Sequence, residues 1–358
     1  MDSTNVPDKE RKMELSKLQK EIINAPYDKV VVIASAASGK TATMTEKVRQ
    51  IIQSGVNPRQ VAVITFTNMA AGELRKRLGA DYKDGLFVGT IHSLANYMLN
   101  MGGVDTSKIL NDEKFDELFE LIEENPHCIR HLEWILLDEA QDSDPMQFKF
   151  LFDMINPERF FITGDPKQSI YQWKDADPQL MMDLARRPGV HLFSMNENYR
   201  NGFNILKFAK QIIKPTKLID DSIAMRQGNG AVTETPFSLD RIVQYVKQGK
   251  FGDWAILTRT NAEIGLITGK LNREKIPYDT FKQGDLSNEE LSEKMKQDTV
   301  KVLTIHSAKG LEFENVIVFG TRFTPKEERN VCYVAATRAR ENLIWMNQKK
   351  QNTKMYKW

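Results

Sequence analysis

Residues 30–41 read Val-Val-Val-Ile-Ala-Ser-Ala-Ala-Ser-Gly-Lys-Thr, and this stretch decides the fold. Its four β-branched residues predict a buried strand, and the small residues after them predict a loop that enters a helix over residues 42–54. A strand, a small-residue loop, Gly-Lys-Thr and a helix are together typical of a nucleotide-phosphate cradle. In such a cradle Lys40 neutralises the β- and γ-phosphate oxygens, the Thr41 hydroxyl holds Mg²⁺, and backbone N–H groups face the phosphates. The other residues of this predicted loop are Ala34, Ser35, Ala36, Ala37, Ser38 and Gly39.

This loop departs from the usual pattern at Ala34, which stands where a glycine is usual, and has another non-glycine residue at Ala37. If Ala37 adopts a positive φ, its side chain costs on the order of 1 kcal/mol there, and nucleotide binding is expected to be weakened. For this stretch taken alone, a strand-to-helix turn that happens to be rich in small residues remains the alternative.

The composition is that of an ordinary globular chain, long enough at 358 residues for two domains. A net charge of +2 says nothing about partners, and two cysteines in unrelated contexts favour neither a disulfide framework nor a metal cluster. No apolar N-terminal signal is present, and no apolar run reaches the roughly 18 residues of a membrane span. We therefore expect a cytoplasmic protein that has no membrane partner.

Polar side chains follow several further apolar stretches. Such stretches end in polar residues at 61–68, 87–93, 134–142 and 160–173, and helical spacing follows at 69–78 and 94–101. Residues 190–193 are expected to close this first sheet, and a second set of alternations begins at residue 253. Repeated strand–helix units indicate an α/β fold of parallel sheets, in which ligands bind at the carboxyl ends of the strands.

Further helices are expected from apolar spacing and capping signals. Asp112 is expected to cap an acidic helix over residues 112–125, and Ser287 opens a short helix with a capping box. Other helices are expected at 15–23, 203–213, 239–247 and 329–340, whereas residues 215–235 are expected to be mostly loop. On the sequence alone, Gln19 of the first helix is expected at the surface.

Two of the polar strand ends carry recognisable chemistry. An apolar strand ends in Asp138-Glu139, where Asp138 is expected to hold Mg²⁺ and Glu139 to deprotonate the attacking water. After the next strand, Gln168 is expected to sense the γ-phosphate, and Tyr171 and Trp173 offer flat faces for bases, worth about 1–3 kcal/mol per stacked base. The alternative that Trp173 merely packs against the following loop stays open.

Eight segments, in the same order along the chain, resemble the motifs of the UvrD/Rep/PcrA branch of superfamily 1 DNA helicases. They are Ala-Ser-Ala-Ala-Ser-Gly-Lys-Thr (34–41), Thr-Phe-Thr-Asn-Met-Ala-Ala (65–71), Gly-Thr-Ile-His-Ser (89–93), Leu-Asp-Glu-Ala-Gln-Asp (137–142), Gly-Asp-Pro-Lys-Gln-Ser-Ile-Tyr-Gln-Trp (164–173), Asn-Tyr-Arg (198–200), Thr-Ile-His-Ser-Ala-Lys-Gly-Leu-Glu-Phe (304–313) and Tyr-Val-Ala-Ala-Thr-Arg-Ala-Arg (333–340). The resemblance implies two RecA-like P-loop NTPase domains, residues 1–195 and 196–358, each a mainly parallel sheet flanked by helices. The ATP site would lie in the cleft between them.

The resemblance also implies roles for individual residues. In the ATP site, Gln19 would read the adenine edge, Tyr199 would stack on adenine, and Glu312 would bind the ribose. Arg200 and Arg338 would reach the γ-phosphate as arginine fingers, and Gln168 would couple it to DNA. The residues implied to contact single-stranded DNA are Phe66, Asn68, Thr90, His92, Tyr171, Trp173 and His306.

The chain departs from this family in the size of two intervals and at Met69, which stands where a lysine is usual. Where family members carry large accessory insertions, only short helices are expected, at 115–124 and 289–296. We therefore expect a minimal ATP-driven 3′→5′ translocase or helicase that acts on single-stranded DNA or on a tailed or forked duplex. Strand separation would be weak or would require a protein partner in place of the accessory domains. The alternative is a nucleotide-gated DNA-binding or recruitment subunit of a larger complex; RNA as the bound strand is not excluded by the residues.

Overall fold

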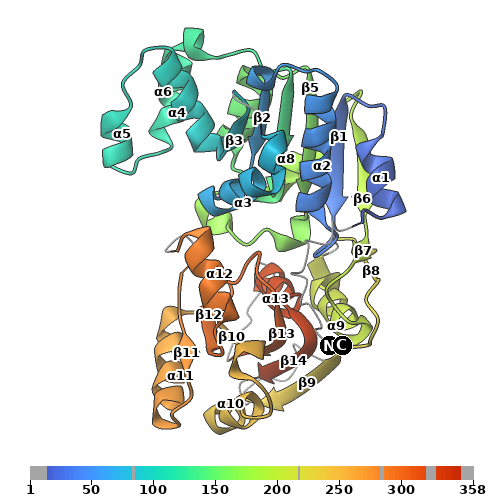
Figure 1. Cartoon of the computed structure of the whole chain (residues 1–358), viewed down its shortest axis with the longest axis vertical. Helices are drawn as coiled ribbons and strands as arrows, with labels where there is room; N and C mark the ends of the chain where they lie inside the picture. The colour runs from blue at the N-terminus through green and yellow to red at the C-terminus, as the bar shows by residue number, and fades with distance from the viewer. Residues whose placement is uncertain (1–13, 83–84, 217, 283–285, 320–327, 348–358) are drawn as a thin grey trace, which may run out of the picture.

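The computed structural model describes residues 14–82, 85–216, 218–282, 286–319 and 328–347, and these residues form two six-stranded sheets, one above the other (Figure 1). The first sheet has the order β3-β2-β4-β5-β1-β6, and every neighbouring pair is parallel. Its strands are β1 (Lys29–Ala34), β2 (Val61–Ile64), β3 (Phe87–Gly89), β4 (Trp134–Leu137), β5 (Arg159–Gly164) and β6 (His191–Met195). The prediction that residues 190–193 close this sheet is confirmed, because β6 is its edge strand.

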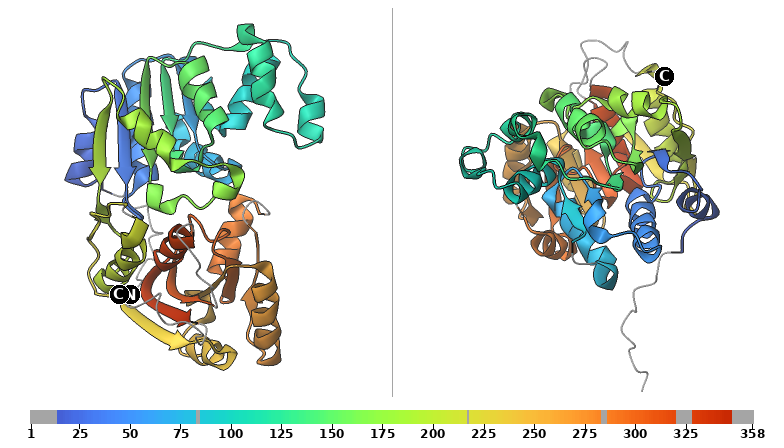
Figure 2. Two further views of the ribbon diagram at one scale, coloured as in Figure 1. Left: turned by 180° about the vertical axis from the view of Figure 1, so that it is seen from behind. Right: turned by 90° about the horizontal axis from the view of Figure 1, so that it is seen from above.

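Alternate side chains of β1 face opposite layers of helices, as the two-residue period of a strand requires. Val31 packs into the core beneath α4, α6 and α8, whereas Val30 and Val32 pack into the core beneath α1, α2 and α3. The helices of this part are α1 (Lys17–Ile23), α2 (Lys40–Gln53), α3 (Asn68–Leu78), α4 (Ile91–Met101), α5 (Ser107–Asn111), α6 (Glu117–Glu124), α7 (Pro145–Lys149) and α8 (Pro178–Ala185). Figure 2 shows that α4, α5 and α6 project sideways from the sheet.

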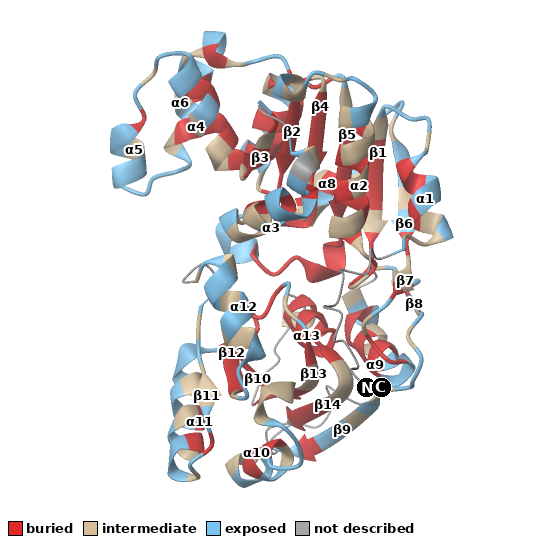
Figure 3. Cartoon of the chain, viewed as in Figure 1, coloured by how far each residue is buried: buried red, intermediate tan, exposed pale blue. Residues whose placement is uncertain are grey.

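The second sheet is also entirely parallel, in the order β11-β12-β10-β13-β14-β9. Its strands are β9 (Ala231–Pro236), β10 (Trp254–Thr258), β11 (Tyr278–Asp279), β12 (Val300–Thr304), β13 (Phe313–Val318) and β14 (Ala339–Asn347). The helices around it are α9 (Phe203–Ile213), α10 (Leu239–Val246), α11 (Asn261–Arg273), α12 (Asn288–Lys296) and α13 (Glu328–Ala336). Figure 3 shows the central strands β10, β12 and β13 largely buried, whereas the edge strand β9 and the helices α11 and α12 present exposed faces.

Each sheet, with its helices, is one domain, and the two domains share an apolar core. Ala36, Ile170 and Tyr171, which follow strands of the first sheet, pack into the same cluster as Val316, Tyr333 and other residues of the second domain. Between the sheets the chain passes through two short paired strands, β7 (Glu197–Asn198) and β8 (Ile223–Ala224). The boundary after residue 195 stays a prediction.

Two expectations about elements are wrong. The helix expected over 112–125 begins only at Glu117, as α6, because Asp112 is the C-cap of the preceding helix α5 and Glu113 has a positive φ of 56°. The helix expected to reach residue 340 ends at Ala336, because the Arg338 carbonyl accepts the Phe313 N–H at 3.0 Å as β14 begins. The stretch 215–235 is mostly loop, as expected, and it also contains β8 and most of β9, the edge strand of the second sheet.

No helix among the described segments is long and apolar enough to cross a membrane.

Candidate active site

The loop after β1 has the backbone conformation of an anion cradle. Gly39 has a φ of +84°, and a Cβ there would lie 2.4 Å from the Gln19 amide nitrogen, so only glycine fits. Ala37 has a φ of +56°, which is the strained conformation considered from the sequence. The Ser38 hydroxyl is buried and has no hydrogen-bond partner in the described part of the chain. A loop with an unsatisfied hydroxyl and a helix N-terminus fits a phosphate group.

Gln19 is buried beneath this loop, so the expectation of a surface position is wrong. Its amide nitrogen donates to the Ser38 carbonyl at 2.9 Å, and its amide oxygen accepts the Ser16 N–H at 2.9 Å. The apolar spacing of the first helix could not reveal this, because the contact is made by a loop 19 residues later. The amide therefore supports the cradle from below.

The first turn of α2 faces the acidic end of β4. Lys40 is buried, and its Nζ lies 3.8 Å from Glu139 Oε1. The Thr41 hydroxyl donates to Asp138 Oδ2 at 3.3 Å, and Thr163 donates to the other Asp138 oxygen at 2.5 Å. A hydroxyl beside a carboxylate is a ligand set that Mg²⁺ prefers, so Thr41 and Asp138 fit the ion implied by the motif.

The pKa values of the two carboxylates of this strand end are shifted in opposite directions. Burial and the neighbouring Glu139 raise the pKa of Asp138, although Lys40 opposes the shift. Burial also acts to raise the pKa of Glu139, but Lys40 and Lys309 outweigh it and bring that pKa down to about 2. Glu139 also has a positive φ of 55°, a strain of the kind found at functional sites. Glu139 is therefore an ionised carboxylate held at the mouth of the cradle.

The opposite wall of the site comes from the second domain. Arg200 Nε lies 2.6 Å from Glu312 Oε2, and Arg200 Nη1 donates to the Thr337 carbonyl at 3.1 Å. Arg338 is buried, and its Nη2 donates to Gln168 Oε1 of the first domain at 3.1 Å. Burial and the nearby Arg200 lower the pKa of Arg338 to about 9, so it stays charged at neutral pH.

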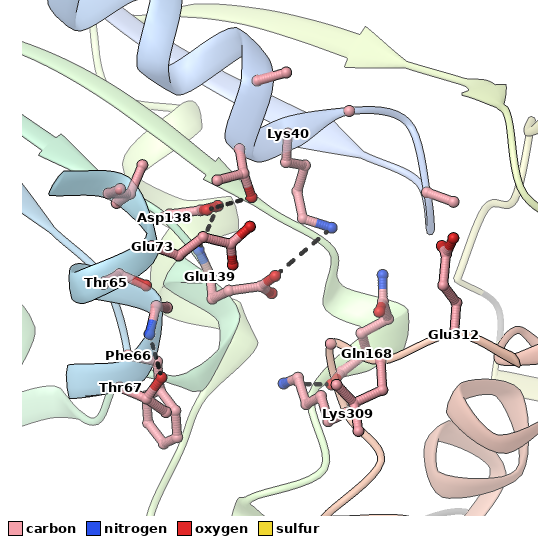
Figure 4. A pocket seen from close by; sticks show the side chains of 18 of the residues that line it. Lys40, Thr65, Phe66, Thr67, Glu73, Asp138, Glu139, Gln168, Lys309 and Glu312 are labelled. Carbon is pink, nitrogen blue, oxygen red and sulfur yellow. Dashed lines mark hydrogen bonds and ion pairs between the residues drawn. The ribbon is translucent and has the colours of Figure 1, made fainter. Parts of the chain in front are cut away.

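Both walls line one cavity of about 710 Å³ (Figure 4). Tyr199, which is exposed, also lines it; its N–H donates to the Ala37 carbonyl at 3.1 Å and its hydroxyl to Glu197 at 2.8 Å. The predicted site residues that the structure brings to this cavity are Gln19, Ala37, Ser38, Gly39, Lys40, Thr41, Phe66, Asp138, Glu139, Gln168, Tyr171, Tyr199, Arg200, Glu312 and Arg338. Ala34, Ser35 and Ala36 precede it as the end of β1 and the start of the loop.

Lys309 and Asp142 are site residues that were not predicted. Lys309, from the second domain, forms a buried ion pair with Asp142 of the first domain and donates to the Gln168 carbonyl at 3.0 Å. Its Nζ also lies 4.9 Å from the centre of the Tyr171 ring. A lysine in the turn after β12 was the available signal, since the ends of such strands carry ligand contacts. Nothing in the sequence says which carboxylate it meets.

Of the residues expected to bind a nucleic-acid strand, Phe66 and Tyr171 line this cavity, and His306 comes from the second domain. The others, Asn68, Thr90, His92 and Trp173, follow strands of the first sheet. Phe66 stacks on Tyr171 with ring centres 5.0 Å apart, and His306 lies 5.9 Å from Tyr171. Tyr171 is only 5% exposed in this packing, whereas Trp173 is 68% exposed, so Trp173 does not pack against the following loop. Asn68 is the first residue of α3.

Thr90 and His92 follow the strand β3, and both side chains already form contacts within the first domain. The Thr90 hydroxyl accepts the Ser93 N–H at 3.2 Å as the cap of α4. His92 Nε2 lies 3.2 Å from Asp116, and its ring packs on Phe119 of α6. The structure therefore brings four aromatic side chains together (Phe66, Tyr171, Trp173 and His306), with Thr90 and His92 to one side.

Comparison with known proteins agrees with this geometry. The model of the UvrD/REP helicase N-terminal domain matches residues 15–126 and 118–188, and the model of the UvrD-like helicase C-terminal domain matches residues 193–286 and 279–350. DNA helicase II of Escherichia coli is 25% identical over 74% of this chain and 51% of its own length, and ATP-dependent DNA helicase Rep of the same organism is 24% identical over 74% and 55%. The chain thus spans about half the length of these curated relatives. Gabija protein GajB of Bacillus cereus is 23% identical over 88% of this chain and 92% of its own length. Since the family models cover both domains and the cavity between them carries their phosphate loop and paired carboxylates, the chain belongs to the UvrD/Rep family of helicases, whose domains are RecA-like.

Proposed function

We propose that this chain hydrolyses ATP with Mg²⁺ and uses the turnover to move 3′→5′ along single-stranded DNA. The observation that carries the proposal is the two-sided cavity. Lys40 and Glu139 stand on one wall and Arg200 and Arg338 on the other, within one space of about 710 Å³. Phosphoryl transfer needs negative charge neutralised around the transferred group, and cations supplied across a cleft make hydrolysis depend on its closure.

Each side chain has a defined task in this proposal. Lys40 binds the β- and γ-phosphates, and Glu139, ionised through Lys40 and Lys309, orients the attacking water and accepts its proton. Thr41 and Asp138 would hold Mg²⁺, which neutralises phosphate charge when bound. Arg200 would exchange its contact with Glu312 for the γ-phosphate, which frees Glu312 for the ribose. Gln19 and Tyr199 would bind the adenine.

Coupling to the strand would pass through the loop after β5. Gln168 contacts Arg338, and three residues later Tyr171 packs against Phe66, with exposed Trp173 beyond it. Gln168 is therefore only three to five residues along the chain from the aromatic side chains that would stack on bases, so a change in its contacts can reach them. Base stacking on such rings tolerates any sequence, as a motor requires. Asn68, Thr90, His92 and His306 would complete the strand-binding surface.

The test is an ATPase assay with single-stranded DNA, duplex DNA and single-stranded RNA, paired with unwinding of duplexes that carry a 3′ or a 5′ tail. We expect single-stranded DNA to stimulate hydrolysis strongly and the 3′-tailed duplex to be preferred. Lys40→Ala should abolish hydrolysis because the phosphate-neutralising charge is lost. A wild-type chain whose hydrolysis does not respond to single-stranded DNA would rule the proposal out.

The second candidate is a nucleotide-gated subunit that recruits a partner protein to DNA, with weak unwinding of its own. In the described part of the chain, the interval between β3 and β4 holds α4, α5, α6 and a short 3-10 helix (Pro126–Cys128), and the interval between β11 and β12 holds α12. Asn288 of α12 donates to the Met69 carbonyl of α3 at 3.0 Å. The relative GajB matches over 88% of this chain and 92% of its own length. Processive unwinding by the isolated chain would exclude this candidate. Under either candidate we propose a cytoplasmic location and a domain boundary between residues 195 and 196.

A further inference from the structure

A chain of contacts between buried polar and charged side chains joins the two domains at Gln168 and Arg338. Asp165, Lys167 and Gln168 come from the turn after β5, and all three are buried, with Lys167 only 2% exposed. Asp220 and Arg338 come from the region after the first sheet, and the Asp220 carboxylate is 3% exposed. Long charged side chains are rarely buried unless they are paired, so this set needs an explanation.

The contacts run from one domain to the other and back. Lys167 Nζ lies 4.0 Å from Asp220 Oδ1 and 3.2 Å from Asp165 Oδ1. Asp165 Oδ2 accepts a hydrogen bond from Gln168 Nε2 at 2.8 Å, and Gln168 Oε1 accepts one from Arg338 Nη2 at 3.1 Å. The amide of Gln168 is therefore held at both ends, and its oxygen is turned toward Arg338.

The opposite charges in this chain of contacts stabilise one another. Burial alone would lower the pKa of Lys167, but the Asp165 and Asp220 carboxylates outweigh it and raise that pKa, so the ammonium group is retained. Asp220 Oδ1 is fixed in turn by the Ser222 N–H at 3.1 Å, whereas Asp220 Oδ2 has no hydrogen-bond partner in the part of the chain that the structure describes. Ser222 thus holds the Asp220 carboxylate of the second domain in position beside Lys167 of the first domain.

We propose that Lys167 and Asp220 are positioning residues for the γ-phosphate-sensing pair Gln168 and Arg338. Asp220 holds Lys167, Lys167 holds Asp165, and Asp165 fixes the Gln168 amide so that its oxygen meets Arg338. This inference rests on the proposed function, since it assigns roles in the same site. A misplacement of about 1 Å in such a site costs on the order of 100-fold in rate.

The test compares Lys167→Met, Lys167→Arg and Asp220→Asn with Lys301→Met as a matched control. Lys301 is also a buried lysine, 3.4 Å from Asp279 in the second sheet, but it does not line the cavity. We expect Lys167→Met to lower kcat of ATP hydrolysis on the order of 100-fold with KM for ATP nearly unchanged, because the lost contact acts in the transition state. Lys167→Arg should recover most of that loss, and Asp220→Asn should cost about 10-fold, since Asp165 still holds Lys167. Lys301→Met should lower thermal stability while kcat of the folded protein stays within about twofold.

Binding of ADP with aluminium fluoride, which mimics the transition state, gives a readout that needs no DNA and no turnover. Lys167→Met should weaken this complex on the order of 100-fold relative to ADP alone. Equal losses of ADP and ADP–aluminium fluoride affinity, wild-type kcat in Lys167→Met, no recovery in Lys167→Arg, or the same loss of kcat in Lys301→Met would each overturn the positioning role. A wild-type chain that binds the mimic but is not stimulated by DNA would instead count against the proposed function alone.

Discussion

Trp173→Ala removes an exposed indole, and we expect it to weaken binding of single-stranded DNA without destabilising the fold. In the structure two thirds of this side chain faces solvent, and its ring contacts are with Lys174 at 5.0 Å and the edge of Tyr171 at 6.4 Å. If Trp173 stacks on a base, Trp173→Ala removes about 1–3 kcal/mol of binding free energy, which weakens affinity for single-stranded DNA by roughly 5- to 150-fold. The expected loss is in the dissociation constant and not in the fold.

Tyr171→Ala, unlike Trp173→Ala, is expected to lower the free energy of unfolding substantially. Because Trp173 is already largely hydrated, Trp173→Ala should change the free energy of unfolding by less than about 1 kcal/mol. Tyr171 is buried against Phe66, so Tyr171→Ala should destabilise the chain on the order of 3 kcal/mol. Urea denaturation of the two variants gives this comparison directly.

The assay for strand binding is fluorescence anisotropy of a labelled single-stranded oligonucleotide at several salt concentrations. Trp173→Ala removes no charge, so the dependence of log affinity on log salt should keep the wild-type slope. Lys174→Ala, one residue away, should reduce the magnitude of that slope by about 0.7 if its ammonium group meets a phosphate. Unchanged affinity in Trp173→Ala, or a large loss of its stability, would refute the assignment of this ring to the DNA surface.

Three further predictions concern the nucleotide site. Glu139→Gln should lower kcat at least about 100-fold while binding of a fluorescent ATP analogue persists, since the base is lost and Lys40 is kept; equal loss of binding would contradict this. Burial raises the pKa of Asp142 to about 7, so between its unfolded and folded pKa values the folded chain binds a proton that the unfolded chain has released. Stability from this group therefore falls as pH rises toward 7, and Asp142→Asn should flatten the pH dependence of urea unfolding in that range. Ala37→Gly should relieve the positive φ and raise the unfolding free energy by up to about 1 kcal/mol, measured by the same denaturation.

The sequence was sufficient for the parts of the site that are local. The strand and loop at 30–41 and the acidic end of β4 each carry their own signal, because one short segment contains both the element and the chemistry. Gln19 was misjudged and Lys309 was missed for a common reason: their partners, Ser38 and Asp142, are distant in the chain. Pairings of that kind depend on how the elements pack, and no period or spacing encodes them.

Helix ends were misjudged where tertiary contacts decide them. The apolar spacing continues past Ala336, but the Arg338 carbonyl is taken by β13, so the backbone leaves the helix there. That early exit turns the Arg338 side chain back onto Val334 and toward Gln168. The resemblance identified Arg338, and the structure gives the physical reason for its position.

The turn after β5 decides how the two domains should behave when they are expressed as separate fragments. Ile170 and Tyr171 belong to the apolar core of the second domain, and Lys167 reaches one of its carboxylates. A fragment cut after residue 195 would expose these apolar side chains, and its Lys167 would lose Asp220 and keep only Asp165. The other fragment would expose the surface around Asp220 and Arg338. Each half has its own sheet, but each half covers side chains that the other would otherwise expose to solvent. Co-expression of both halves should therefore recover soluble protein that either half alone loses to aggregation.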